Sequence, residues 1–173
     1  MVRLCGLSVS MGTLEEAAQA VLCLSHQQRA TLVLTPNVDY YVRWYRDRDF
    51  RAICSRASYL ALDGVPLAKL ASMMTGRHVS RVAGVDLFGR VCAGARQAGA
   101  TISVLGGAAG VGQAAIENLR RQYGHFSVVI VESPSPDELE SPKYLTELAR
   151  RIGAYDHGIV ALCLGSPKQE RVA

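Results

Sequence analysis

The sequence predicts an α/β protein with a Rossmann-like, mostly parallel sheet and helices on both of its faces. Two observations carry this prediction: short, β-branched apolar runs recur along the chain and end at turn-forming residues, and they alternate with longer segments of helical periodicity. A strand–helix–strand order is typical of a parallel sheet covered on both sides. The 173 residues, 49% of them hydrophobic, suit a single domain over 1–173 with a core of its own.

The expected strands are short and apolar, as is usual for strands buried on both faces of a parallel sheet. The first of them, TLVLT, is ended by Pro36. The complete set covers residues 31–35, 59–62, 101–105, 126–131 and 158–164.

The expected helices carry recognisable start and stop signals. Thr13, followed three residues later by Glu16, predicts a capping box at the start of a helix over 14–28. Pro66 fits the first turn of a helix over 65–74, and Gly99 fits the end of another. The remaining helices are expected over 85–97, 113–123 and 142–152, and 133–141 is expected to be a loop.

Composition excludes several classes of function. The net charge of +4 is mild, and basic residues do not alternate with aromatic ones over a long stretch, which argues against nucleic-acid binding. Five scattered cysteines without a CxxC pair indicate small buried hydrophobes in a reducing compartment. No signal peptide or membrane-spanning run is recognised. No cluster has metal-ligand spacing, and Asp47-Arg48-Asp49 reads as a solvated charged face, so neither a metal nor a cofactor is predicted.

Polar and turn-forming residues follow four of the expected strands. They are Thr35-Pro36-Asn37, Asp63-Gly64, Gly106-Gly107 and the stretch 165–170, GSPKQE. Each alone is ordinary turn chemistry, but ligands of open parallel sheets bind beyond the carboxyl ends of the strands. The four together therefore predict a site at that edge.

Asp63 is the most informative of these residues, because a carboxylate at the rim of a sheet is well placed as a general base. The basic loop that contains Arg81 is either simply solvated or supplies a guanidinium for a phosphate or sugar. The turn 106–112 is small enough to approach a diphosphate, although it is neither GxGxxG nor a Walker A loop. Glu132, at the end of the next strand, keeps an NAD-dependent oxidoreductase open as an alternative.

The ordered motifs of this chain resemble the WecG/TagA/CpsF family of glycosyltransferases. The resemblance rests on five stretches in order over nearly the whole chain: TPNVD at 35–39, DGVP at 63–66, RVAGVDL at 81–87, LGG at 105–107 and GSPKQE at 165–170.

The resemblance implies an inverting, metal-independent transfer of N-acetylmannosamine, or a related sugar, from UDP. The implied acceptor is N-acetylglucosamine on undecaprenyl diphosphate, in teichoic acid or surface polysaccharide synthesis, with the protein peripheral at the inner face of the cytoplasmic membrane. Asp63 would be the base, and Gly106 and Gly107 would approach the nucleotide. The residues implied to contact sugar or phosphate are Thr35, Asn37, Arg81 and Gln169.

Two departures from the family pattern lead to further expectations. The sequence ends at Ala173, where the family continues with a C-terminal, membrane-contacting segment, so the chain is expected to lack that segment. The stretch 124–141 is also less family-like. A non-catalytic nucleotide-sugar binding module therefore stays open as a second alternative. The aromatic stretch 40–45 fits either the core or a homo-oligomer contact, and the core is favoured.

Overall fold

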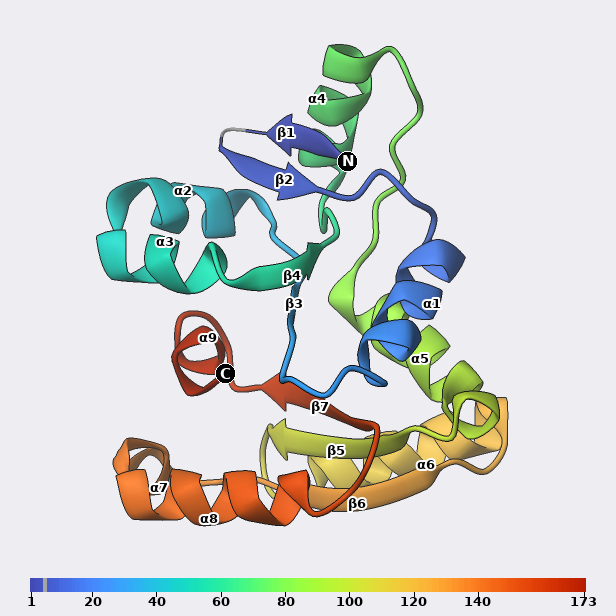
Figure 1. Cartoon of the computed structure of the whole chain (residues 1–173), viewed down its shortest axis with the longest axis vertical. Coiled ribbons are helices and arrows are strands. Elements are labelled where there is room, and N and C mark those ends of the chain that lie inside the picture. The colour runs from blue at the N-terminus through green and yellow to red at the C-terminus, as the bar shows by residue number, and fades with distance from the viewer. Residues whose placement is uncertain (5) are drawn as a thin grey trace. The chain divides into compact units, whose positions relative to one another are not determined.

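The computed structural model describes residues 1–4 and 6–173. By internal contacts the chain divides into two compact units, Met1–Val91 and Cys92–Ala173, and each is described by itself. Both units combine a small parallel sheet with helices, so the predicted α/β class is confirmed (Figure 1). That the chain forms one catalytic core stays a prediction.

The first unit contains an antiparallel hairpin and a two-stranded parallel sheet. In the hairpin β1 pairs with β2, and in the sheet β3 pairs with β4. The elements in chain order are β1 (Val2–Leu4), β2 (Leu7–Val9), α1 (Leu14–Leu24), β3 (Leu32–Leu34), α2 (Val38–Arg46), α3 (Arg48–Cys54), β4 (Ala57–Leu60) and α4 (Val65–Thr75). Helix α5 (Gly84–Ala98) begins in this unit and crosses the boundary to the second.

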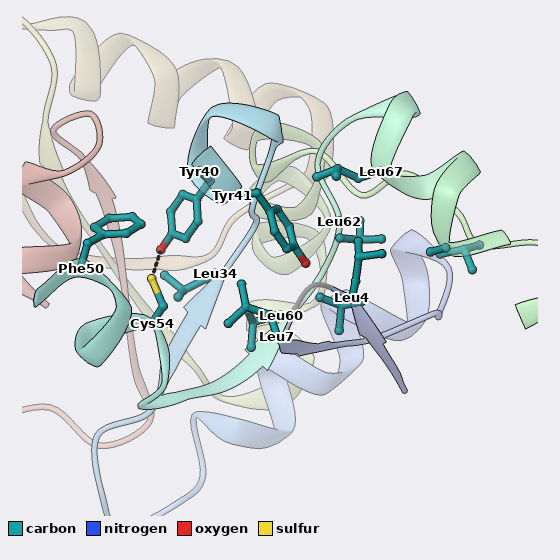
Figure 2. Packing of buried hydrophobic residues seen from close by; sticks show 13 residues of the cluster. Leu4, Leu7, Leu34, Tyr40, Tyr41, Phe50, Cys54, Leu60, Leu62 and Leu67 are labelled. Carbon is teal, nitrogen blue, oxygen red and sulfur yellow. Dashed lines mark hydrogen bonds between the residues drawn. The ribbon is translucent and has the colours of Figure 1, made fainter. Parts of the chain in front are cut away.

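Leucine and aromatic side chains from the hairpin, the sheet and the helices form the core of the first unit. Phe50 is 2% exposed and packs against the Tyr40 ring at a centroid distance of 4.7 Å. Figure 2 shows Leu67, from α4, at one side of this cluster, and the Cys54 thiol donating to the Tyr40 hydroxyl at 3.4 Å. The aromatic helix α2 therefore contributes two rings to the core, as favoured from the sequence, while Tyr45 is 75% exposed.

The second unit is built on a three-stranded parallel sheet in the order β6-β5-β7. Its elements are β5 (Thr101–Gly106), α6 (Val111–Tyr123), β6 (Ser127–Glu132), α7 (Pro136–Glu140), α8 (Pro142–Gly153), β7 (Gly158–Cys163) and α9 (Lys168–Val172).

Helices cover both faces of this sheet. On one face, Gly112 of α6 lies so close to β6 that an added Cβ would come 2.8 Å from Val131. On the other face, Leu148 of α8 packs against Leu105 and Ile130. Since neighbouring strand residues point to opposite faces, these contacts place α6 and α8 on opposite sides, as the sequence predicted.

Local signals explain most element boundaries. The capping box at the start of α1 is confirmed: the Glu16 amide donates to Thr13 Oγ1 at 3.2 Å, and the Thr13 amide donates to the Glu16 carboxylate at 2.7 Å. The expected loop 133–141 is wrong in part, because Pro136–Glu140 is helical. Ser135 and Glu138 form a second capping box there. The segment was predicted as a loop because it is rich in Pro, Ser and acidic residues.

Asp47 and the cysteines correct two further expectations. Asp47 is an N-cap that accepts from the amides of Asp49 and Phe50, so it has a structural role beyond being a solvated charge. Cys54 and Cys92 are buried as expected, and burial raises the pKa of the Cys92 thiol to about 12. Two cysteines contradict that expectation, because Cys23 and Cys163 are exposed. Cys5 lies outside the described residues.

Candidate functional site

The first candidate site lies at the carboxyl edge of the parallel sheet in unit 1. Backbone pairing continues past the strands: the Ala61 amide donates to the Leu34 carbonyl at 3.0 Å, and the Asp63 amide donates to the Pro36 carbonyl, also at 3.0 Å. These two bonds hold Asp63 beside the Thr35–Asn37 turn. The predicted convergence of these two strand ends is therefore present.

Arg81 is brought to the same edge by a third strand-like contact. The Val82 amide donates to the Leu62 carbonyl at 2.8 Å, which sets the 81–83 segment alongside the residues that follow β4. Arg81 Nε then donates to Asp63 Oδ1 at 3.3 Å. The Asp63 side chain is 29% exposed and that of Arg81 is 49% exposed, so the pair lies at the surface, open to a ligand.

Thr35 packs against the start of α5 at this edge. An added Cβ on Gly84 would lie 3.0 Å from Thr35 Oγ1, so the glycine allows the helix to approach the strand end closely. Thr35 is half-buried as a result. One sheet edge therefore holds residues from three separate stretches of the sequence. They are Thr35, Asn37, Asp63 and Arg81, together with Gly84.

Asn37 has a clear structural role as the N-cap of α2. Its Oδ1 accepts the Tyr40 amide at 2.9 Å. Asn37 is exposed, and it belongs to the turn that lies beside Asp63. Its implied contact with a sugar stays a prediction.

The second candidate region lies at the carboxyl edge of the sheet in unit 2. Gly106 has a φ of +111°, and an added Cβ would lie 2.5 Å from the Cys163 carbonyl oxygen. Gly107 follows with a φ of +77° and donates its amide to that same oxygen at 3.1 Å. Packing against β7 therefore requires a glycine at position 106, whereas Gly107 is favoured by its positive φ, and the Gly107 N–H is already engaged.

The exposed part of this turn leads into α6. Gly110, with a φ of +81°, precedes the helix and has no side chain to cap it. The Val111 amide donates to the Ala108 carbonyl at 3.0 Å, and the next amides of the first turn have no side-chain partner at the cap position. Backbone groups of this kind favour anions, which agrees with the implied diphosphate contact at this strand end.

Gln169 lies in α9 and bonds its own neighbour. Its Nε2 donates to Glu170 Oε1 at 3.0 Å. Glu170 is 2% exposed, and its Oε2 has no hydrogen-bond partner within the part of the chain that the structure describes. A buried acid is uncommon and calls for a partner, yet nothing in the GSPKQE pattern alone distinguishes Glu170 from a surface residue.

Glu132, the basis of the oxidoreductase alternative, is held by α8. Its carboxylate accepts from Arg151 at 2.5 Å and from the Tyr144 hydroxyl at 3.0 Å. The bond from Arg151, followed by the bond from Tyr144, holds the pKa of Glu132 below its usual range. Burial together with the Glu132 contact raises the pKa of Tyr144 to about 12. The glutamate thus joins β6 to α8, which gives it a structural role apart from any contact with a ribose.

This ion pair makes the stability of unit 2 dependent on pH. A carboxyl group whose folded pKa is lowered stabilises the fold above its unfolded pKa, near 4.5, and loses that contribution as pH falls through the folded value. We expect Glu132→Gln to flatten the acid side of the stability profile. Urea unfolding between pH 7 and pH 3 measures this, with Glu140→Gln as a control that keeps the wild-type slope. Parallel profiles for Glu132→Gln and the wild type would contradict it.

Two other kinds of feature are absent from the described part of the chain. Across residues 1–4 and 6–173, no group of three or more His, Cys, Asp or Glu side chains is arranged to hold a metal ion. None of the helices in that described part is both long and apolar enough to cross a membrane.

A comparison with known families defines the class of protein. The family model described as "Glycosyl transferase WecG/TagA/CpsF family" matches residues 2–173, and this defines a transferase that acts on sugars. The chain belongs to the WecG/TagA/CpsF glycosyltransferase family.

Proposed function

We propose that the chain transfers N-acetylmannosamine, or a related sugar, from UDP to N-acetylglucosamine on an undecaprenyl diphosphate carrier, with inversion and without a metal. The observation that carries this proposal is the Asp63 carboxylate, held by Arg81 at a sheet edge in a member of a glycosyltransferase family. The reaction would serve teichoic acid or surface polysaccharide synthesis at the inner face of the cytoplasmic membrane.

Asp63 supplies the base in this proposal. The acceptor hydroxyl oxygen attacks the anomeric carbon of the donor, its proton passes to the Asp63 carboxylate, and the bond to UDP breaks with the electron pair leaving on the phosphate. Inversion follows because attack and departure occur on opposite faces of the sugar. Arg81 contacts Oδ1 of Asp63, and no other side chain in the described residues bonds this carboxylate, so it keeps lone pairs for the acceptor.

Charge on the departing UDP needs stabilisation without a metal. Backbone amides at a helix start and guanidinium groups can both stabilise a developing phosphate charge. Arg81 offers the second at the Asp63 edge of unit 1. The turn from Gly106 to the start of α6 is assigned to the nucleotide through the family motif LGG alone. Thr35, Asn37 and Gln169 are assigned to sugar contacts in this proposal.

The test is turnover with defined substrates. Protein is incubated with UDP-N-acetylmannosamine and a short-chain lipid diphosphate carrying N-acetylglucosamine, and UDP release is followed alongside product mass. UDP-N-acetylglucosamine and UDP-glucose serve as alternative donors, and a reaction without acceptor measures hydrolysis. UDP binding without turnover on any donor would contradict the proposal and favour a non-catalytic nucleotide-sugar module.

We expect Arg81→Gln to lower kcat/KM by about 10- to 100-fold, because a neutral amide stabilises phosphate charge less well than a guanidinium. Arg81→Lys should recover only part of the loss, since an ammonium group cannot make the two-pronged contact. Steady-state kinetics measures both, with Arg56→Gln, an exposed arginine outside the candidate site, as the control. Equal kinetics for Arg81→Gln and the wild type would remove Arg81 from the site.

A further inference from the structure

The solvent face of helix α4 is apolar, which is unusual for a surface helix. Leu67, Ala68 and Ala71 form its buried face. The opposite face is formed by residues at helical spacing: Val65 is 52% exposed, Leu70 41%, Met73 82% and Met74 57%, and Pro66 and Lys69 are also exposed. An amphipathic helix would carry polar residues here. We call this surface the α4 face.

A shallow hollow borders the α4 face. It has a volume of about 540 Å³, and its walls are mainly apolar. The residues that line it are Val65, Ala68, Lys69, Ser72, Met73, His78, Val79 and Arg81. The hollow therefore runs from the α4 face to Arg81, the partner of Asp63.

The charged side chains of α4 and of the loop that follows it have one sign. Residues 64–85 contain no aspartate or glutamate, and they carry Lys69, Arg77 and Arg81, of which Arg81 is paired with Asp63. All three cations are exposed. An exposed apolar surface with a basic border is the pattern of a helix that lies in the interface of an anionic membrane.

We propose that the α4 face docks on the anionic surface of a lipid bilayer, with Leu70, Met73 and Met74 in the headgroup region and Lys69 and Arg77 on lipid phosphates. Charge decides against a second copy of the chain as the occupant. A two-fold contact would set the α4 face against itself, and the basic border would then meet an identical basic border.

The docking surface would also serve the proposed transfer reaction, and this part of the inference rests on the proposed function. Because the hollow leads from the α4 face to Arg81, a chain seated on a bilayer would hold Asp63 beside the membrane surface. An acceptor sugar on a lipid carrier is presented at that surface. The α4 face would thus raise the local concentration of acceptor without itself taking part in the transfer.

The experiment is co-sedimentation of the full chain with vesicles of phosphatidylcholine, with and without 30% phosphatidylglycerol (about one lipid in three, a usual anionic content). We expect binding to the anionic vesicles that weakens with salt. The triple variant Leu70→Gln/Met73→Gln/Met74→Gln should bind about tenfold more weakly or worse. The matched control Val42→Gln/Tyr45→Gln, which removes exposed apolar residues from α2, should bind like the wild type.

Two double variants that each remove two cations test the electrostatic contribution to vesicle binding. Lys69→Gln/Arg77→Gln should weaken binding to anionic vesicles by about 25-fold, at about fivefold for each cation. The matched control Arg3→Gln/Arg56→Gln makes the same change in net charge at exposed positions outside the α4 face and should lose much less. Equal losses in the two variants would overturn the proposed geometry.

A single substitution that adds a fluorescent probe tests the same contact independently, in case the triple variant misfolds. Met73→Trp should shift its emission to the blue on anionic vesicles, whereas Tyr45→Trp should not. No binding by the wild-type chain, or a triple variant that binds like the wild type, overturns the proposal. So does a triple variant that only converts a dimer to a monomer in sedimentation velocity.

Failure of this inference is distinguishable from failure of the proposed function. With a short-chain, water-soluble acceptor, the triple variant should turn over like the wild type, and its loss should appear only with long-chain acceptor in vesicles. Vesicle binding without turnover on any acceptor would support the docking surface and contradict the transferase proposal. Turnover on soluble acceptor without vesicle binding would do the reverse.

Discussion

Replacement of Asp63 by asparagine is expected to lower kcat for sugar transfer by roughly 1,000-fold, the usual contribution of a positioned general base. Asparagine keeps the shape of the side chain and an oxygen for Arg81 Nε, but it cannot take the proton of the acceptor hydroxyl. The exposed contact with Arg81 contributes at most about 1 kcal/mol to stability, so the fold should persist. Single-turnover measurement of UDP release, beside a thermal unfolding curve, separates the two effects.

Asp49→Asn is the matched control for this prediction. Asp49 is an exposed aspartate in the first turn of α3, outside the candidate site, and it should retain full activity. UDP binding should also survive in Asp63→Asn, because this variant leaves the turn at Gly106 intact. An Asp63→Asn protein that transfers sugar within a few fold of the wild type would remove Asp63 as the base.

Gly106→Ala is expected to destabilise the protein by about 3 kcal/mol, since it combines a backbone conformation that L residues avoid with a clash against a backbone oxygen. The added Cβ would lie 2.5 Å from the Cys163 carbonyl oxygen at a φ of +111°. Neither β5 nor β7 can move away without breaking its ladder. For a chain of this size the melting temperature should fall by roughly 6–12 °C.

Gly153→Ala provides the comparison for this variant. Nothing lies within 4 Å of a Cβ at Gly153, which sits at the end of α8 with an ordinary φ, so the change should be neutral or slightly stabilising. Differential scanning calorimetry measures both. A Gly106→Ala protein that melts with the wild type would show that β7 is not packed against this glycine.

The elements that the sequence predicts best are those decided by local chemistry. The Thr13–Glu16 capping box and Pro66 at the start of α4 each act within one helical turn, and both are present. The parallel strands are also predictable, because burial on both faces leaves continuous apolar runs. The hairpin of β1 and β2 was not predicted, since strands of three residues carry too few positions for an alternating pattern.

The candidate site was predictable in its residues but not in its contacts. Strand ends placed Thr35 and Asp63 at one edge, and backbone pairing beside them agrees. The contact between Asp63 and Arg81 spans 18 residues, and the pairing of Val82 with Leu62 that creates it leaves no mark in a sequence pattern. Glu132 illustrates the same limit. Its position at a strand end suggested a contact with a ligand, whereas in the structure its carboxylate accepts from Arg151 in the last turn of α8.

The cap at the start of α2 fixes the hydrogen-bonding sense of one residue of the candidate site. Because Asn37 Oδ1 accepts the Tyr40 amide, the orientation of the amide is set, and its –NH₂ group is the part left for a ligand. Asn37 can therefore select for lone pairs and against N–H or O–H groups pointing at it. A carbonyl oxygen, such as that of an N-acetyl group, satisfies this polarity, whereas an ammonium group in the same position would meet two donors.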